Sequence, residues 1–452
     1  MNIIVAGLGK IGLRLVELLS LEENHNITVI DTRASALQDV VHSYDVIGVA
    51  GNSASLDTLT EAGIKDADIL IAVTGSDELN LLTCFIARKI SKCDTIARVR
   101  NPEYAKELQL FKDDLGLAMI INPELSAATE IARTLSFPSA IKIDTFAKER
   151  VEIFKFAIKE NSPLCDLRIA DLSSRLDCDI LVCGVEREDK AYIPDGNFML
   201  HEGDFVSIVA TFKKAVAFIK RIGLKTNKIK NTIIVGGGTT AVYLAKMLSK
   251  SGIQVKIIEN NPQRSELLCS LLPEASIINA DGTENRTLSE EGIEKCEAFV
   301  ALTNIDEENI LLSLYAKTVS NAKIVTKINK INYDEVINSL GLDTIIYPKN
   351  LTAEQVIRFV RAKNNSLENN IETMHYIFDG KAEALEFRIN ENSPIVNKTI
   401  ESLSLKKDII IASINRNGSI ITPRGKDTIV CGDTVIIVTT HKGLKDISDI
   451  LE

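Results

Sequence analysis

The residues whose spacing most clearly suggests chemistry are glycines that directly follow an apolar run. Near its start the chain reads IVAGLGKIG, in which Gly7, Gly9 and Gly12 form a Gly-x-Gly-x-x-Gly turn. The first glycine permits a tight turn from strand to helix, the second lets a pyrophosphate approach the backbone, and the third lets the helix pack closely. Lys10 and Ile11 complete the turn, where the N–H groups of the new helix would face the phosphates. The pattern predicts a dinucleotide or nucleotide site.

An acidic residue supports this interpretation. Asp31 ends the apolar run ITVID, 19 residues beyond Gly12. A carboxylate at about that distance bonds the ribose 2′-hydroxyl in dinucleotide-binding domains. It would repel a 2′-phosphate, so NAD(H) is favoured over NADP(H), while ATP and ADP carry the same hydroxyl and remain alternative ligands. Arg33 would favour a 2′-phosphate if it reached the ligand, but arginines are more often exposed surface side chains.

The chain contains the same motif a second time. Gly236, Gly238 and Ala241 repeat the three glycine positions 229 residues later, with Thr239 after the second glycine. The same offset carries ADILIAVTGSDELN onto CEAFVALTNIDEEN. Similarity sustained over about 100 residues at one offset indicates a duplication.

The second copy departs from the first at the residues expected to face phosphate. Glu259 replaces the ribose aspartate at the end of VKIIE, Lys327 stands opposite Arg98, and Asn329 stands opposite Arg100. Arginine binds phosphate oxygens with a fixed fork, whereas lysine offers only a point charge. The first site is therefore predicted to be the stronger.

The apolar pattern predicts the fold class. In the first large repeat unit, NIIVAG, NITVID, DILIAVT and TIARVR have strand length and alternate with stretches of helical spacing. This alternation predicts two Rossmann-like, doubly wound α/β domains with parallel sheets. RVEIFKFAI, DILVCGVER and DFVSIVAT, around one helical segment, predict a small α+β module after each large domain. The predicted domains are residues 1–136, 140–224, 231–361 and 371–452, and the polar run AKNNSLENN (362–370) marks the last join.

Composition excludes several classes of protein. The net charge of -10 argues against a nucleic-acid binder, which would show a basic face. No apolar run approaches the roughly 18–20 residues of a membrane span, and the start resembles no signal peptide, so a cytoplasmic location is expected. The eight cysteines form no Cys-x-x-Cys pair, so no metal site is predicted and reduced, buried thiols are expected.

No catalytic motif accompanies the glycine turns. The five histidines share no motif, and there is no nucleophile elbow or phosphate-loop lysine. In SDELN, Ser76 and its acidic neighbours are expected to cap a helix, while Thr74 and Asn80 are candidates for the adenine side. We therefore predict a nucleotide sensor and no enzyme. The alternative from another class is an NAD-dependent oxidoreductase of duplicated Rossmann architecture, which turnover of NADH would reveal.

A family resemblance now becomes apparent. GLGKIG with VID, VAGNSAS, AGIKDADILIAVTGSDELNLLTC and IARVRNPEY, together with NADGTE and ALTNIDEENILLSLYAK, strongly resemble the TrkA proteins of Trk potassium-uptake systems. The resemblance spans the chain as tandem RCK nucleotide-binding domains and TrkA-C modules. It implies a non-catalytic subunit that binds NAD(H) or ATP/ADP and forms a homotetrameric ring. That ring would lie on the inner face of the membrane, beneath a TrkH/TrkG-type channel subunit whose potassium flux it gates. A nucleotide sensor for a different transporter is the alternative to this interpretation.

The resemblance also implies roles for individual residues. The glycines would hold the phosphates and the acids the ribose, and phosphate-facing cations would follow later in each large domain. Asn52 stands where single-copy relatives commonly have Asp, so the first pocket is expected to differ from theirs in ligand preference. The positions implied are Gly7, Gly9, Gly12, Asp31, Asn52, Ser53, Arg98 and Arg100, and in the second half Gly236, Gly238, Glu259, Asp281 and Lys327.

Overall fold

The described chain forms two compact units, each of which draws on both halves of the repeat. One unit comprises Met1–Ala132 with Ile229–Val360, and the other Arg133–Lys228 with Arg361–Glu452. The expected boundaries at residues 140 and 224 lie outside the described residues. The computed structural model describes residues 1–22, 25–102, 104, 114–136, 142–146, 151–188, 190–223, 229–330, 336–337, 340–342, 344–368, 371–378, 381–444 and 446–452.

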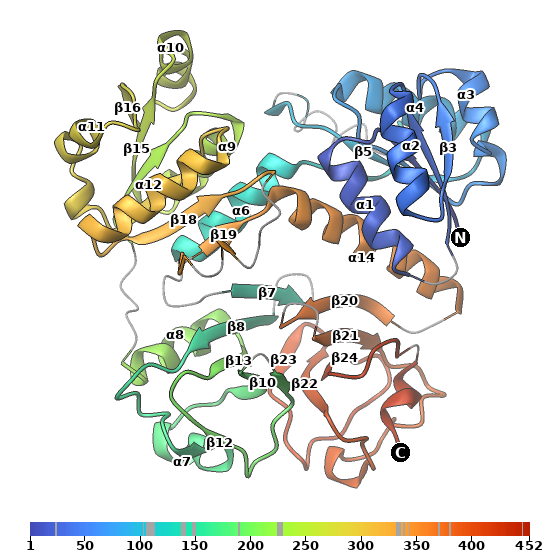
Figure 1. Ribbon diagram of the computed structural model, residues 1–452. Helices are drawn as coiled ribbons and strands as arrows, with labels where there is room; N and C mark the ends of the chain where they lie inside the picture. Colours follow the sequence, from blue (N-terminus) through green and yellow to red (C-terminus); the bar gives the residue numbers. More distant parts are fainter. Residues whose placement is uncertain are drawn as a thin grey trace. The chain divides into compact units, whose positions relative to one another are not determined.

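The first large domain is built on a six-stranded parallel sheet (Figure 1). Its strand order is β3-β2-β1-β4-β5-β6, which confirms the predicted doubly wound α/β class. The edge strands β3 and β6 were not predicted, because IGVA is short and broken by a glycine and LAMII has no alternation. The strands are β1 (Asn2–Ala6), β2 (Asn26–Asp31), β3 (Ile47–Ala50), β4 (Ile69–Ala72), β5 (Asp94–Arg98) and β6 (Leu117–Ile121).

Helices cover both faces of this sheet. Ile3 and Val5 of β1 pack in one core with α1 and α2, while Ile4 packs in the other core with α3 and α4. This follows from the alternation of side chains along a strand. These helices are α1 (Lys10–Ser20), α2 (Ala34–Ser43), α3 (Leu56–Glu61) and α4 (Asp77–Ile90). Helix α6 (Pro123–Ser136) follows β6 in the chain.

A helix from the second half completes the first core. Helix α14 (Pro348–Glu368) contributes Val356 and Val360, both fully buried, to the core that contains Val5. The polar run expected to form a join is helical up to Glu368, because its alanine, lysine, leucine and glutamate residues are good helix formers. The first half of the sequence therefore does not complete its own core.

The second large domain repeats the first. Its parallel sheet has the order β16-β15-β14-β17-β18-β19. The strands are β14 (Asn231–Val235), β15 (Gln254–Glu259), β16 (Ser276–Asn279), β17 (Ala298–Ala301), β18 (Lys323–Lys327) and β19 (Thr344–Ile346). The remaining helices are α9 (Thr239–Lys250), α10 (Pro262–Leu271), α11 (Asn285–Glu290) and α12 (Asp306–Val319).

The small modules form antiparallel sheets that share a core. A Cβ at Gly184 would lie 2.0 Å from Cζ of Phe378, so the two modules meet closely there. The first module carries the expected helix, α8 (Phe212–Arg221), whereas the described part of the second ends in a short 3-10 helix, η5 (Ile447–Ile450). The main strands are β7 (Lys142–Phe146), β8 (Val151–Ala157), β10 (Leu181–Arg187), β11 (Lys190–Tyr192), β13 (Phe205–Ala210), β20 (Ile371–Ile377), β21 (Ala382–Arg388), β22 (Ile409–Arg416), β23 (Ser419–Ile421) and β24 (Thr434–Thr439).

The cysteines divide by exposure, and this leads to a prediction. The expectation of buried thiols is wrong for Cys269 and Cys431, which are exposed, while Cys84 and Cys296 are buried. Burial raises the pKa of the Cys84 thiol and raises that of Cys296 to about 11. Since the thiolate is the reactive form, a disulfide reagent at pH 8 should modify Cys269 and Cys431 first. Peptide mapping would show this, and rapid labelling of Cys84 in the folded protein would contradict it.

Candidate functional site

The structure brings most of the residues predicted for the first site to one edge of the sheet. The strand order reverses between β1 and β4, and in open α/β sheets ligands bind at such a switch point, beyond the carboxyl ends of the strands. Among the described residues, no group of three His, Cys, Asp or Glu side chains could hold a metal ion. At this edge lie the glycine turn after β1, Asp31 at the end of β2, Asn52 after β3, Thr74 after β4 and Arg98 at the end of β5.

The glycine turn has the backbone that a phosphate group needs. Gly7 has φ +103°, and a Cβ at Gly12 would lie 1.9 Å from the Gly7 carbonyl oxygen. Gly9 precedes α1 and has no side chain to cap it, and a Cβ built there meets nothing within 4 Å. The helix N-terminus therefore opens onto space, which fits an anionic ligand. Ile11, by contrast, packs into the core, so only its backbone can serve the ligand.

The ribose acid is held by its neighbours. Asp31 Oδ2 accepts a hydrogen bond from Leu8 N at 2.7 Å, and Oδ1 accepts from Arg33 N at 2.9 Å and Arg33 Nε at 3.0 Å. Arg33 Nη2 also donates to the Leu8 carbonyl oxygen at 2.9 Å. Burial would raise the pKa of Asp31, but the hydrogen bonds from Arg33 and Leu8 outweigh it and lower the pKa. Arg33 is exposed, as expected, yet it covers the carboxylate, a role that only its closeness in sequence could have suggested.

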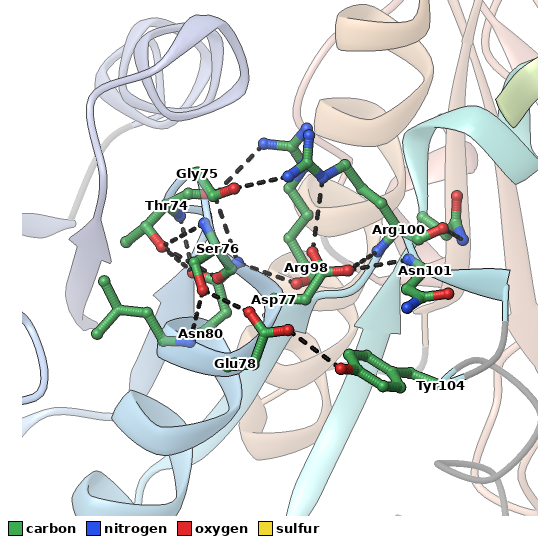
Figure 2. Close-up of polar contacts among 12 residues, drawn as sticks. Thr74, Gly75, Ser76, Asp77, Glu78, Asn80, Arg98, Arg100, Asn101 and Tyr104 are labelled. Atoms are coloured by element: carbon green, nitrogen blue, oxygen red, sulfur yellow. Dashed lines mark hydrogen bonds and ion pairs between the residues drawn. The ribbon is translucent and has the colours of Figure 1, made fainter. Parts of the chain in front are cut away.

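A buried amide joins the ends of β4 and β5 (Figure 2). Asn80 Oδ1 accepts from Thr74 N at 2.8 Å and Thr74 Oγ1 at 2.7 Å, and Asn80 Nδ2 donates to the Arg98 carbonyl oxygen at 2.9 Å. Asn80 is fully buried, so its side chain supports the strands and does not line an adenine pocket. The predicted helix cap is confirmed, since Ser76 Oγ accepts from Leu79 N at 3.2 Å.

The two arginines of β5 and its following loop differ in their partners. Arg98 donates only a long hydrogen bond, 3.4 Å, from Nη1 to the Thr74 carbonyl oxygen, and its buried Nε has no hydrogen-bond partner in the described chain. Burial, and then the nearby Arg100, lower the pKa of Arg98. Arg100 donates to the Gly75 carbonyl oxygen at 2.6 Å and lies 3.5 Å from the Asp77 carboxylate (Figure 2). A buried donor without an acceptor fits an anionic ligand. Arg98 is therefore a better candidate than Arg100 for contacting a phosphate group.

The loop after β3 in the first domain and the loop after β16 in the second domain are built alike. Asn52 Oδ1 accepts from the backbone two residues on at 3.0 Å, and Asp281 Oδ1 accepts from Thr283 N at 2.9 Å and Thr283 Oγ1 at 2.7 Å. The hydrogen bonds from Thr283 lower the pKa of Asp281. The Ser53 hydroxyl is buried against Thr83 Oγ1 at 2.9 Å, so its side chain faces the protein and not the crevice.

The second crevice is an open cavity of about 440 Å³. Glu259 Oε2 accepts from Gly237 N at 2.8 Å, and Oε1 accepts from Asn261 N at 2.9 Å. Arg264 donates to the Gly237 carbonyl oxygen at 2.8 Å, as Arg33 does to Leu8. Of the residues proposed from sequence, Gly236, Gly238, Glu259 and Asp281 line this cavity. Those that sequence reasoning missed include Asn260, Asn261, Arg264, Thr303, Asn304, Ile305 and Glu308.

For three predicted residues the side chain lies outside the crevice, while the backbone of Lys10 and Thr239 still opens the helices after the glycine turns. Lys327 is buried, its Nζ donates to the Leu302 carbonyl oxygen at 3.1 Å, and burial lowers its pKa. Neither it nor Thr239 is among the residues that line the second crevice. Lys10 is exposed at the first position of α1 and lines a different cavity. Residue type and spacing could not predict where these three side chains lie, because that depends on the direction in which each side chain points from its helix or strand.

The comparison with known proteins agrees with this geometry. The TrkA-N domain model matches residues 3–123 and 232–348, and the TrkA-C domain model matches residues 153–223 and 384–452. The chain is 33% identical to the Trk system potassium uptake protein TrkA homolog of Archaeoglobus fulgidus over 100% of both chains. It is 31% identical to the Trk system potassium uptake protein TrkA of Haemophilus influenzae, over 98% of this chain and 96% of that one.

Solved structures show the same fold. The structure of the GsuK channel bound to NAD aligns with a TM-score of 0.63 at 18% identity, over 98% of this chain and 77% of that chain. The GsuK RCK domain aligns with the same TM-score over 98% of this chain and 92% of that chain. The two potassium uptake relatives are not named as enzymes. With both repeat halves matched by the family models and relatives aligned end to end, the chain belongs to the TrkA family.

Proposed function

We propose that this chain is the regulatory subunit of a Trk-type potassium uptake channel and that it binds NAD(H), with ATP and ADP as alternatives. The observation that carries the proposal is that one crevice is built twice. In each crevice a glycine turn without a side-chain cap lies beside a carboxylate, Asp31 in the first half and Glu259 in the second. A backbone N–H group within the glycine turn donates a hydrogen bond to that carboxylate and orients it. Two binding sites suit a sensor whose output depends on nucleotide.

The comparisons support a role in potassium transport. The relatives are potassium uptake proteins, and the GsuK channel has been solved with NAD bound. In the part of the chain that the structure describes, none of the helices combines the length and the hydropathy of a membrane span. The proposal includes a TrkH/TrkG-type membrane subunit as partner, a homotetrameric ring of this chain, and a position on the inner face of the membrane. The names of these relatives describe potassium uptake and give no support to the alternative of an oxidoreductase.

The proposed mechanism is a shift between two conformations. A ligand biases such an equilibrium only by its difference in affinity for the two states. In the first crevice a nucleotide would meet the turn at Gly9 and, across the edge of the sheet, the partly buried guanidinium of Arg98. Asn80 ties the ends of β4 and β5 together, so a shift of Arg98 would reach both strands. Ligands with different numbers of phosphates would hold Arg98 differently.

The test is potassium flux through a reconstituted TrkH-type channel, measured with and without this chain across NAD⁺, NADH, ATP and ADP. The control is a Gly9→Asp/Gly238→Asp chain, which should bind the channel without responding to nucleotide. Flux that depends on the wild-type chain and on nucleotide is expected. Flux that never depends on the chain or on any nucleotide would refute the proposal.

The Arg33 contact leads to a prediction about affinity. Asp31 already accepts four hydrogen bonds, three of them from Arg33, so ribose hydroxyls must displace the guanidinium to reach it. Arg33→Ala should therefore strengthen NAD⁺ binding at the first crevice by about threefold to tenfold, which is up to about 1.4 kcal/mol. Calorimetry on a Gly238→Asp background, where only the first crevice binds, would measure this.

The matched control for Arg33→Ala is Arg264→Ala on a Gly9→Asp background. Arg264 donates to the Gly237 carbonyl oxygen but to neither oxygen of Glu259 in any contact the structure gives, so its removal frees no ribose acceptor. No gain in affinity is expected at the second crevice. Weaker NAD⁺ binding in Arg33→Ala would show that the guanidinium contacts the ligand and does not block it.

A further inference from the structure

The lining of the second crevice carries an excess of negative charge. Of the described residues that line it, three are acidic and one is a cation, and a carboxylate keeps its charge when it accepts a hydrogen bond. Lys327 does not line the crevice, but its Nζ donates to the carbonyl oxygen of Leu302, which does. Even with Lys327 counted, one negative charge remains in excess. The charged lining residues are Glu259, Asp281, Glu308 and Arg264.

Glu308 has no acidic counterpart in the first half. At the repeat offset of 229 residues it stands at the position of Leu79. The structure keeps this register, because the next residues, Asn309 and Asn80, each accept a hydrogen bond of 2.8 Å from the threonine N–H that follows the preceding strand. Glu308 lies in the first turn of α12 and is partly exposed, and its carboxylate has no cation partner among the described residues. Its charge is therefore available to a ligand.

The strand order indicates which part of a dinucleotide would meet Glu308. Strand β14 leads into the glycine turn, and β15 and β17 flank it on opposite sides. In doubly wound sheets the pyrophosphate lies at this turn and the two halves of a dinucleotide extend to either side of it. Glu259 ends β15 and marks the adenosine side, whereas Thr303, Asn304 and Glu308 follow β17. Glu308 therefore lies on the side of the second nucleoside, which in NAD carries the nicotinamide ring.

We propose that the second crevice selects NAD⁺ over NADH and over ATP, and that Glu308 determines this preference. The inference rests on the nucleotide binding proposed above for this crevice. NAD⁺ has a cationic nicotinamide ring, which a carboxylate on that side attracts, whereas the ring of NADH is neutral. ATP adds phosphate charge, which the negative lining repels. Ile305, which lines the same side and is 49% exposed, offers apolar contact to the ring.

The first crevice lacks the means for this selection. Leu79 gives it no charge at the position of Glu308, and the partly buried Arg98, whose Nε has no hydrogen-bond partner in the described chain, would favour phosphate over a cationic ring. The two crevices would then respond to different ligands. The first would respond to nucleotides in general, and the second to the oxidised share of the NAD pool.

The test is calorimetry at low salt on a Gly9→Asp chain, in which only the second crevice binds nucleotide. NAD⁺ should bind about threefold to fivefold more tightly than NADH, which is the range of a partly exposed ion pair, and ATP should bind more weakly than either. Glu308→Gln on this background should weaken NAD⁺ binding to the level of NADH and leave NADH binding unchanged. The matched control is Glu307→Gln, which removes the same charge from the neighbouring exposed residue outside the crevice and should keep the preference.

Two further measurements distinguish a charge effect from a structural one. At about 1 M salt, where charges are screened beyond about 3 Å, the preference for NAD⁺ should shrink in the Gly9→Asp chain. Glu308→Asp should retain part of the preference, because the charge is kept. The melting temperatures of these variants without ligand should match that of the Gly9→Asp chain, since residue 308 is not buried.

The outcomes separate this inference from the proposed regulation. Equal affinity for NAD⁺ and NADH in the Gly9→Asp chain would overturn the inference, and so would a preference that persists in Glu308→Gln. Binding of neither dinucleotide would overturn it together with nucleotide binding at the second crevice. A preference that depends on Glu308 would uphold it even if potassium flux did not respond to any nucleotide, a result that would refute only the proposed regulation.

Discussion

Gly9→Asp is expected to abolish nucleotide binding at the first crevice while leaving the fold intact. A Cβ at Gly9 meets nothing within 4 Å, so the residue can be accommodated. Its carboxylate would occupy the space in front of the α1 N-terminus, where it would compete with the ligand's phosphates for the N–H groups and repel them. A loss of at least about 100-fold in affinity, or about 3 kcal/mol, is expected. Calorimetry should show one remaining site.

The second half supplies the control. Gly238→Asp makes the same change before α9, where a Cβ also meets nothing within 4 Å. It should remove only the second site, and the double variant should bind no nucleotide. Undiminished binding at two sites in Gly9→Asp would show that the glycine turn does not hold the phosphates. Loss of both sites from either single change would show that the crevices do not bind independently.

Val356→Asp is expected to destabilise the first large domain although it lies in the second half of the sequence. Val356 is fully buried in the core that contains Val5 and Leu15. A carboxylate there would lack a partner and displace apolar packing, which is expected to cost more than about 4 kcal/mol. Urea unfolding followed by circular dichroism would measure the loss, and NAD⁺ binding at the first crevice should fall with it.

Leu311→Asp is the matched control for this change. Leu311 lies on α12 in the same half and is 67% exposed, so an aspartate there should alter stability by less than about 0.5 kcal/mol. Equal unfolding midpoints for the two variants would contradict the view that α14 completes the first core.

The sequence was informative where local pattern decides structure. The glycine turns, the acids at the ends of β2 and β15 and the central strands followed from apolar runs and spacing, because backbone geometry restricts those positions. The cap at Ser76 could be predicted for the same reason, since a hydroxyl before a helix meets free N–H groups nearby.

The remainder depends on contacts that pattern does not encode. Arg33 and Arg264 look like ordinary surface arginines, and only the folded turn shows them bonded to Leu8 and Gly237. Ser53 and Asn80 have polar side chains that suit a ligand, but packing turns both into the protein.

The placement of α14 has a consequence for synthesis on the ribosome. The first six strands emerge early with α1 and α2, yet the residues that complete the core on this face of the sheet, Ala353 to Val360, emerge about 220 residues after Ala132. At about 5–20 residues per second this delay is roughly 10–45 s. During that time the part of this apolar core that α14 covers is open to chaperones or to a neighbouring nascent chain. Correct folding therefore requires that α14 be synthesised before the incomplete core associates with another chain. A translational pause before residue 348 would lengthen this exposure and be more harmful than a pause after α14 has emerged.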